Sequence, residues 1–410
     1  MKRSRNIIGI LFLLISSMLS AQNELGNYLQ TAAENNPGLK AKFSDYLAAM
    51  EVAPQVKALP DPQIAFAYFI RPVETRVGPQ EFRFSASQMF PWFGTLKARE
   101  NVAIQNAKVK YELFQEAKSR LYNEIRSAYF NIYLNRRAIE ISTENINILN
   151  SFQKLVIIKV EAAMVSAVDE YRIEMEIGDL ENQLASLRDM QNVLEVMFNN
   201  LLNTKRNEEI ITPEILWNSD ITISKEQVLD SIAHSNHQLL SLSLQQEALN
   251  YRKEIADNLG KPSFSIGLDY TFIGKGSNSL AGTDAFVFPK VGITIPLYRN
   301  KYKAMVNEVV YLQESKEFEK SDKENLLVSV VENTWKEYKD ADRRIHLYAA
   351  QLSLARQSIT LLEIEYSTGN ENFEEILRMD RRVLKYNLEL EKARADKQAA
   401  ISFMNYLMGK

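Results

Sequence analysis

The chain has 410 residues and a formal net charge of −3 at pH 7, from 52 acidic and 49 basic side chains. This balance excludes a basic nucleic-acid-binding protein, because such proteins concentrate positive charge to contact phosphates. The chain has no cysteine, which excludes disulfides and a lipid-bearing cysteine and fits an exported protein. At this length we expect two or three domains.

The first 21 residues have the pattern of a secretory signal peptide. Basic residues precede an apolar run from Ile7 to Leu19, and Ala21 is a small residue before the expected cleavage site. Cleavage removes Lys2, Arg3 and Arg5 and so changes the formal charge to −6. An uncleaved membrane anchor is the alternative. No later segment reaches about 18 consecutive apolar residues, so we expect no transmembrane helix.

Four segments alternate apolar and polar residues, which predicts β-strands. They span residues 63–70, 82–90, 263–272 and 286–295. Polar connections, Arg71 to Gln80 and Gly274 to Asp284, join the strands of each pair. Their length and aromatic content suit strands that cross a bilayer at a tilt. The apolar residues expected on shared faces are Ile64, Phe66, Tyr68 and Ile70; Phe82, Phe84, Ala86 and Phe90; Phe264, Ile266, Leu268, Tyr270 and Phe272; and Val287, Val291, Ile293 and Ile295.

Long spans without proline predict long helices, because proline costs about 3 kcal/mol in a helix interior. No proline occurs between Trp92 and Thr212 or after Leu297. From Ile173 to Leu201 and from Ile376 to Met404, apolar residues recur every seven positions with a second row beside them, which indicates packed helix seams.

Gln191 and Lys397 are polar interruptions of these two seams. They stand at equivalent positions of the two seams. Such residues either line water or fix the register of the helices.

The two halves of the chain align with each other, which indicates a tandem duplication. The aligned pairs include Leu29 and Leu229, Pro91 and Pro296, Arg172 and Arg378, and Asn199 and Asn405. We therefore expect a signal peptide (1–21), a first repeat (22–203), an inter-repeat linker (204–224) and a second repeat (225–410). Each repeat contains a helix, two strands and long helices. Four strands are too few to close a barrel, which implies an oligomer.

The sequence shows no catalytic constellation. It has three histidines, no cysteine and no glycine-rich phosphate loop after a predicted strand. We therefore expect no enzyme activity, no cofactor and no bound metal.

Four short motifs follow one another along the two repeats. They are Asn35-Asn36-Pro37, Leu59-Pro60-Asp61-Pro62, the stretch from Gln88 to Gly94 (QMFPWFG), and Tyr366-Ser367-Thr368-Gly369 followed by Glu375. In this order, and with the duplication, the chain resembles the TolC-type outer-membrane efflux factor family over essentially all of its length after the signal peptide. The second and third motifs resemble the heavy-metal efflux branch in particular.

The resemblance implies a mainly α fold with a small β part. In it, tandem-duplicated long antiparallel helices form a periplasmic α-barrel, and four strands per chain contribute to a trimeric 12-stranded outer-membrane β-barrel. It also implies a passive exit duct of a tripartite efflux pump. The implied partners are two further copies of the chain, a periplasmic adaptor (membrane fusion) protein, an inner-membrane pump of the resistance-nodulation-division type and outer-membrane lipid, with no nucleic acid. The alternatives are the exit duct of a type I protein secretion system and a secreted coiled-coil scaffold.

The resemblance further implies a gate at the periplasmic tip of the helices. Aligned through Tyr366 and Gly369, one acidic gate position falls on Glu375, and the repeat offset of 206 gives Asp169 in the first copy. A ring of three such carboxylates would favour cations. A solvated charge at a helix end is the alternative for both residues.

The chain departs from the family at two gate positions. The basic bonding partner after the glycine is replaced by Glu371, and a second acidic position is occupied by Arg378. Other pairs, such as Arg378 with a neighbouring carboxylate, would then stabilise the gate.

Three aromatic residues, Trp92, Phe93 and Tyr298, stand where strands are expected to end and long helices to begin. They suit an interfacial aromatic belt, and ordinary packing at the junction between barrel and helices is an equal alternative.

Overall fold

The computed structural model describes residues 24–276, 282–368 and 373–410. The expected signal peptide lies outside the described residues, as do Gly369 and Glu371. The chain divides into two compact units, and each unit contains segments of both repeats. Unit 1 comprises the chain up to Ala41, Gln115–Asn236 and Glu324–Lys410, and unit 2 comprises Lys42–Phe114 and His237–Lys323.

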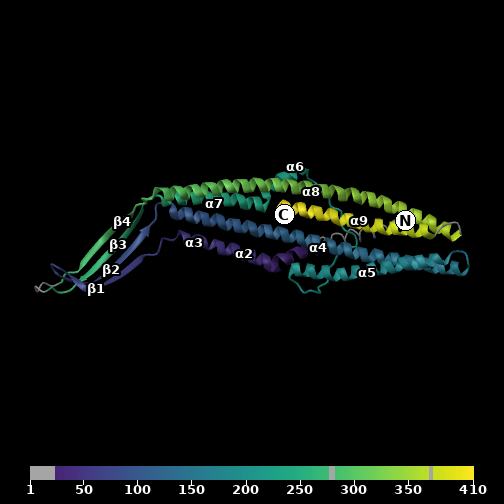
Figure 1. Cartoon of the computed structure of the whole chain (residues 1–410), viewed down its shortest axis with the longest axis horizontal. Coiled ribbons are helices and arrows are strands. Elements are labelled where there is room, and N and C mark those ends of the chain that lie inside the picture. Colours follow the sequence, from purple (N-terminus) through teal and green to yellow (C-terminus); the bar gives the residue numbers. More distant parts are fainter. Residues whose placement is uncertain (1–23, 277–281, 369–372) are drawn as a thin grey trace, which may run out of the picture. The chain divides into compact units, whose positions relative to one another are not determined.

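Unit 2 contains a four-stranded antiparallel sheet with the strand order β1-β2-β3-β4 (Figure 1). The strands are β1 (Gln63–Thr75), β2 (Gly78–Phe90), β3 (Ser263–Ile273) and β4 (Ala285–Thr294). The two repeats meet along β2 and β3, which pair from Gln80 with Ile273 to Phe90 with Phe264. The helices α3 (Val52–Lys57) and α7 (His237–Leu259) also belong to this unit.

The first hairpin is tighter than the sequence analysis predicts. The expected polar connection from Arg71 to Gln80 is largely strand, because β1 continues to Thr75 and β2 begins at Gly78. The two strands pair up to Thr75 opposite Gly78. Gly78 has a φ of +138°, a conformation that side chains with a Cβ rarely adopt, so this position suits a glycine.

The register of the sheet places most of the expected apolar residues on one face. Phe66 lies opposite Phe84, and Phe82 lies opposite Phe272, with ring centroids 4.9 Å apart in the second pair. Several of these side chains are exposed in the single chain, including Ile64 (68%) and Tyr68 (70%). The sheet therefore presents an apolar face that this chain alone leaves uncovered.

One strand prediction is wrong. The alternation expected in β4 put Val287 on the same face as Val291, but Val287 lies opposite Asp269, whereas Phe286 lies opposite Tyr270 on the apolar face. The register shifts between Gly267 and Asp269, which inserts an extra residue into β4. An inserted residue reverses the face of every side chain beyond it.

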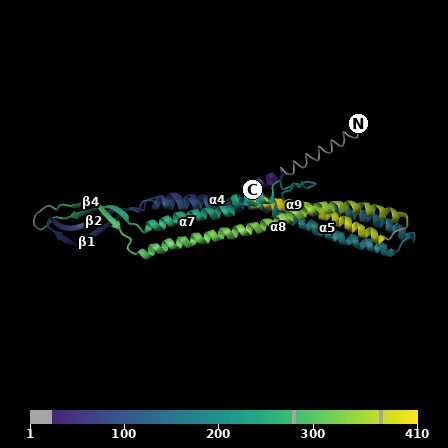
Figure 2. The same cartoon turned by 90° about the horizontal axis from the view of Figure 1, so that it is seen from above.

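Four long helices dominate the described part of the chain (Figures 1 and 2). They are α4 (Thr95–Glu161), α5 (Ala167–Leu202), α8 (Arg299–Thr368) and α9 (Phe373–Leu407). Shorter helices are α2 (Pro37–Met50) and α6 (Lys225–Ser235), and residues 24–35 are also helical. Within unit 1, a core from α4, α5, α8 and α9 includes Leu149, Ile173, Ile376 and Leu377. Among the described helices, none is apolar enough over a sufficient length to span a membrane.

Within unit 1, three tyrosine hydroxyls bind the backbone of the inter-repeat linker. The backbone N–H groups of Ile211, Leu216 and Ile221 donate hydrogen bonds to Tyr28, Tyr133 and Tyr338, at 3.0, 3.1 and 3.3 Å. These donors are spaced by five residues. The linker therefore contacts helices of both repeats, since Tyr133 lies in α4 and Tyr338 in α8.

Lys397 is buried, with 1% exposure, and it also binds the linker. Its ammonium group donates to Asn218 at 2.9 Å and to Asp220 at 2.5 Å, and it contacts Asp342 of α8 at 2.9 Å. Of the two roles left open for this polar interruption, these contacts favour a fixed register.

We expect Lys397→Met to destabilise unit 1 by about 1–3 kcal/mol, because it leaves the carboxylates of Asp220 and Asp342 without their common cation. Thermal unfolding of the purified protein, followed by circular dichroism, measures the change. Lys392→Met on the exposed side of the same helix is the matched control. Equal melting temperatures for the two variants would contradict a structural role for Lys397.

Candidate functional site

The residues expected to form a gate lie at three helix ends in unit 1. Asp169 is in the first turn of α5, Tyr366 is near the end of α8, and Glu375 and Arg378 are in the first turns of α9. Ser166 caps α5, because its side chain accepts a hydrogen bond from the N–H of Val168. The carboxylates of Asp169 and Glu375 follow helix N-termini, where negative charge is favourable.

Tyr366 is packed inside this end of unit 1, with 2% exposure. Its ring lies 5.4 Å from that of Phe373, and the buried ammonium group of Lys159 lies 4.0 Å from its centroid. Lys159 also donates to the backbone carbonyl of Tyr366. Burial, followed by the nearby charge of Asp169, raises the pKa of the tyrosine hydroxyl. Tyr366 thus connects the ends of α4 and α8 and does not face solvent in the single chain.

The two acidic candidates have the same local geometry in both repeats. Asp169 pairs with Arg172 at 3.2 Å, and Glu375 pairs with Arg378 in the equivalent position of the second repeat. Arg172 also reaches Glu374 at 3.3 Å and so connects α5 with α9. Arg378 therefore has a neighbouring carboxylate as its partner, the kind of pair that the sequence analysis considers.

A buried carboxylate of this region, Asp380, was not singled out from the sequence. Asp380 has 3% exposure, and both of its carboxylate oxygens accept from Nδ2 of Asn145 at 2.9 Å. Burial raises the pKa of Asp380 to about 6, and the nearby charges of Glu176 and Glu363 act in the same direction. Asp380 lies among apolar residues of the α9 seam, and its burial becomes evident only from the side chains that surround it in the structure.

The expected junction aromatics occupy different environments in unit 2. Trp92 lies 6.1 Å from the ring of Phe264 in a stacked arrangement, whereas Phe93 and Tyr298 are 79% and 80% exposed. Trp92 therefore packs at the end of the sheet. The ring of Phe93 contacts the rings of Trp92 and Phe264 but, like that of Tyr298, is largely exposed to another surface.

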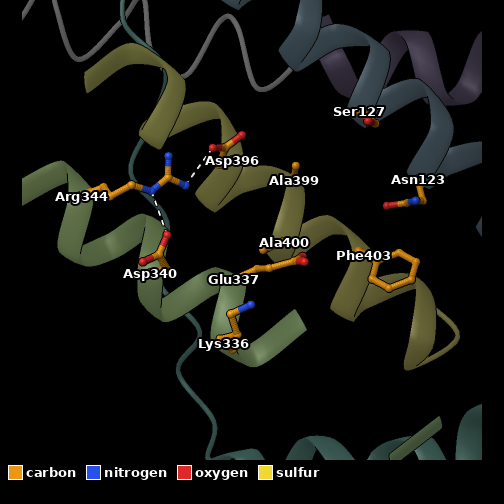
Figure 3. A pocket seen from close by; sticks show the side chains of 10 residues that line it. All are labelled: Asn123, Ser127, Lys336, Glu337, Asp340, Arg344, Asp396, Ala399, Ala400 and Phe403. Atoms are coloured by element: carbon orange, nitrogen blue, oxygen red, sulfur yellow. Dashed lines mark hydrogen bonds and ion pairs between the residues drawn. The ribbon is translucent and has the colours of Figure 1, made fainter. Parts of the chain in front are cut away.

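A cavity of about 490 Å³ in unit 1 lies between α4, α8 and α9. Figure 3 shows Arg344 between Asp340 and Asp396, at 2.9 and 2.8 Å. The wall contains side chains of both charges, and its arginine is paired with two carboxylates, so the cavity does not favour a ligand of one charge.

The buried Asp380 predicts a pH-dependent stability of unit 1. Its pKa is raised from 3.8 to about 6 in the folded chain, so the protein loses stability as the pH rises from about 4 to about 7, by up to about 3 kcal/mol. We expect Asp380→Asn to remove this loss and to raise the melting temperature at pH 7.5. Melting curves of wild type, Asp380→Asn and the exposed control Asp179→Asn at pH 5 and 7.5 test it, and a wild type equally stable at both pH values would contradict it.

No family model and no curated protein sequence matches the chain. Solved structures do match it. The outer membrane protein VceC of Vibrio cholerae has a TM-score of 0.79 at 13% identity, over 96% of this chain and 98% of VceC. The open state of the Neisseria gonorrhoeae MtrE outer membrane channel has a TM-score of 0.76 at 14% identity, over 94% and 89%.

The third structure is CusC, which was studied for the conformational changes that accompany folding and transmembrane channel formation. It has a TM-score of 0.72 at 16% identity, over 94% of this chain and 92% of CusC. These three structures are channels or outer membrane proteins rather than enzymes. The mainly helical chain with one four-stranded antiparallel sheet thus has the fold of the TolC-type outer-membrane efflux channels, the family that its sequence resembles.

Proposed function

We propose that the protein is the outer-membrane exit duct of a tripartite efflux pump and conducts substrates passively from the periplasm to the exterior. The observation that carries this proposal is the sheet of unit 2, which has one apolar and one polar face. The apolar face suits lipid, and the polar face includes Asp269 and Lys290, paired at 3.0 Å, together with Arg83, which donates to Thr271 at 3.2 Å. A membrane-spanning wall around a wet lumen needs this division.

The sheet of one chain has two open edges. Within the described residues, β1 pairs only with β2, and β4 pairs only with β3. Open edges are not tolerated in hydrocarbon, so further copies must supply the missing partners. Three copies of this sheet give the 12 strands implied by the family resemblance.

The helices of unit 1 also support assembly. Exposed apolar residues form a row on α8, with Leu347, Leu354 and Leu361 spaced by seven residues. A second exposed row on α5 comprises Val168, Tyr171 and Met175. The spacing of each row matches one face of a helix, which is typical of a seam between packed helices. We propose that the α8 row of one copy packs against the α5 row of the next.

Asp169 and Glu375 are proposed as gate carboxylates, with Tyr366 and Arg378 positioning the helix ends. Their place at the starts of α5 and α9 and at the end of α8 supports this proposal. Phe93 and Tyr298, exposed at the end of the sheet, are proposed to meet outer-membrane lipid.

The remaining partners are proposed from the resemblance. A periplasmic adaptor would dock on the helical tip, and an inner-membrane pump of the resistance-nodulation-division type would supply the energy. CusC is among the structural neighbours, and the heavy-metal branch stays a proposal. Against a secreted scaffold stands the apolar sheet face, which such a protein does not need.

The α8 row yields a test of assembly. We expect Leu354→Glu to reduce the trimer fraction severalfold, because the charge would be buried in the seam at a cost of several kcal/mol. Thr360→Glu, exposed on α8 beside the row, is the matched control. Crosslinking and native mass spectrometry in detergent measure the trimer fraction. A fully trimeric Leu354→Glu would exclude this row from the interface.

Single-channel conductance in a planar bilayer tests the duct and its gate separately. We expect cation-selective pores whose selectivity falls in Glu375→Ala and Asp169→Ala, because fewer carboxylates then face the passing ions. The exposed Glu144→Ala, in the interior of α4, is the control and should conduct as wild type. Unchanged selectivity would remove the gate assignment, and absence of pores from a trimeric, membrane-extracted sample would overturn the duct.

A further inference from the structure

Unit 2 contains a second cavity, of about 230 Å³, where the sheet ends and the long helices begin. We name it the junction cavity. Its wall includes Trp92, Thr95, Arg99, Asn258, Lys261 and Tyr302. These residues come from the start of α4, the end of α7 and the start of α8, together with the loops that adjoin the strands.

The charge of this wall is one-sided. Arg99 and Lys261 are its charged residues, and no carboxylate belongs to it. Within the described part of the chain, Arg99 has no ion-pair partner, and the ammonium group of Lys261 donates to the neutral amide of Asn258 at 2.9 Å. Glu254 lies close to Gly94 but is not part of the wall. Two positive charges thus border a space that contains no negative charge of its own.

A buried donor in the same wall lacks a partner. Thr95 has 1% exposure, and its hydroxyl makes no hydrogen bond within the described residues. An orphaned buried hydroxyl costs about 1–3 kcal/mol, so it indicates an acceptor that the chain itself does not supply.

Thr95 is also the first residue of α4, at the positive end of the helix dipole, and its own N–H donates to the carbonyl of Trp92 at 3.1 Å. Gly94, with a φ of +84°, precedes it and directs the chain from the sheet into the helix. The helix terminus, the hydroxyl and the two cations therefore favour the same kind of ligand.

We propose that the junction cavity binds a phosphate-type oxyanion, either a free phosphate or sulfate or the phosphate of a phospholipid headgroup. Arg99 and Lys261 would neutralise its charge, and the hydroxyl of Thr95 would donate to one of its oxygens. A cavity of this volume accommodates one such group with room for a small substituent. The cavity of Figure 3 is different, because there Asp340 and Asp396 neutralise the arginine. This site goes beyond the proposed duct and does not depend on conduction.

The test measures binding of two probes to the purified full-length protein. Isothermal titration with inorganic phosphate, after exhaustive delipidation, examines a free anion, and native mass spectrometry with phosphatidylglycerol in mixed micelles examines the headgroup. We expect saturable binding of one equivalent per chain by at least one probe, weakened about tenfold or more in Arg99→Gln/Lys261→Gln. Thr95→Val should weaken it by a smaller factor.

Lys110→Gln/Lys303→Gln removes two exposed positive charges from α4 and α8 and should bind as wild type. Melting curves identify any variant that does not fold, in which case the two single variants replace the double one. Binding of phosphate supports a solute site, and binding of phosphatidylglycerol alone supports a headgroup site. Saturable binding by neither probe, or equal loss in the control, would overturn the proposal.

Discussion

The apolar face and open edges of the four-stranded sheet are the constraint on which the rest of the structure depends. A face with exposed apolar residues such as Ile70 (89%) and Val291 (65%) would make the protein aggregate in water. Unpaired strand edges bind further strands. A single chain can satisfy neither requirement. In the proposed duct, lipid on the apolar face and further copies at the edges satisfy both requirements. The exposed rows on α5 and α8 are proposed to pack against further copies in the same way.

Because of the duplication, the same sequence pattern forms a pair of long helices in each repeat. The linker joins the two repeats. Tyr133 and Tyr338 stand 205 residues apart and each accepts a hydrogen bond from the linker backbone. Tyr133 also donates to the buried carboxylate of Glu391 at 2.6 Å. A segment without long regular elements is thereby attached to both repeats, because each tyrosine satisfies a backbone donor that would otherwise lack a partner.

The long helices and the strand order follow from sequence because proline placement and apolar spacing are local signals. The positions of side chains that depend on the register of distant elements cannot be predicted from such local signals. Because of the bulge in β4, Phe286 rather than Val287 lies on the apolar face. No residue type in the sequence indicates where a strand contains an inserted residue. Asp380 was not singled out from the sequence, and Lys397 stood out only as a polar interruption of a seam with two possible roles. Their partners Asn145, Asp220 and Asp342 explain how these charges are buried.

The two repeats differ where the candidate gate lies, and this difference limits how the gate can open. The position equivalent to Tyr366 in the first repeat is Val160, so the contact between Lys159 and Tyr366 exists once per chain. Separating them would leave a buried ammonium group without its carbonyl and ring, at a cost of several kcal/mol. The ends of α4 and α8 are therefore expected to move together. In the proposed duct the motion of lower cost is then one between chains, because the pair of Glu375 and Arg378 does not take part in that contact.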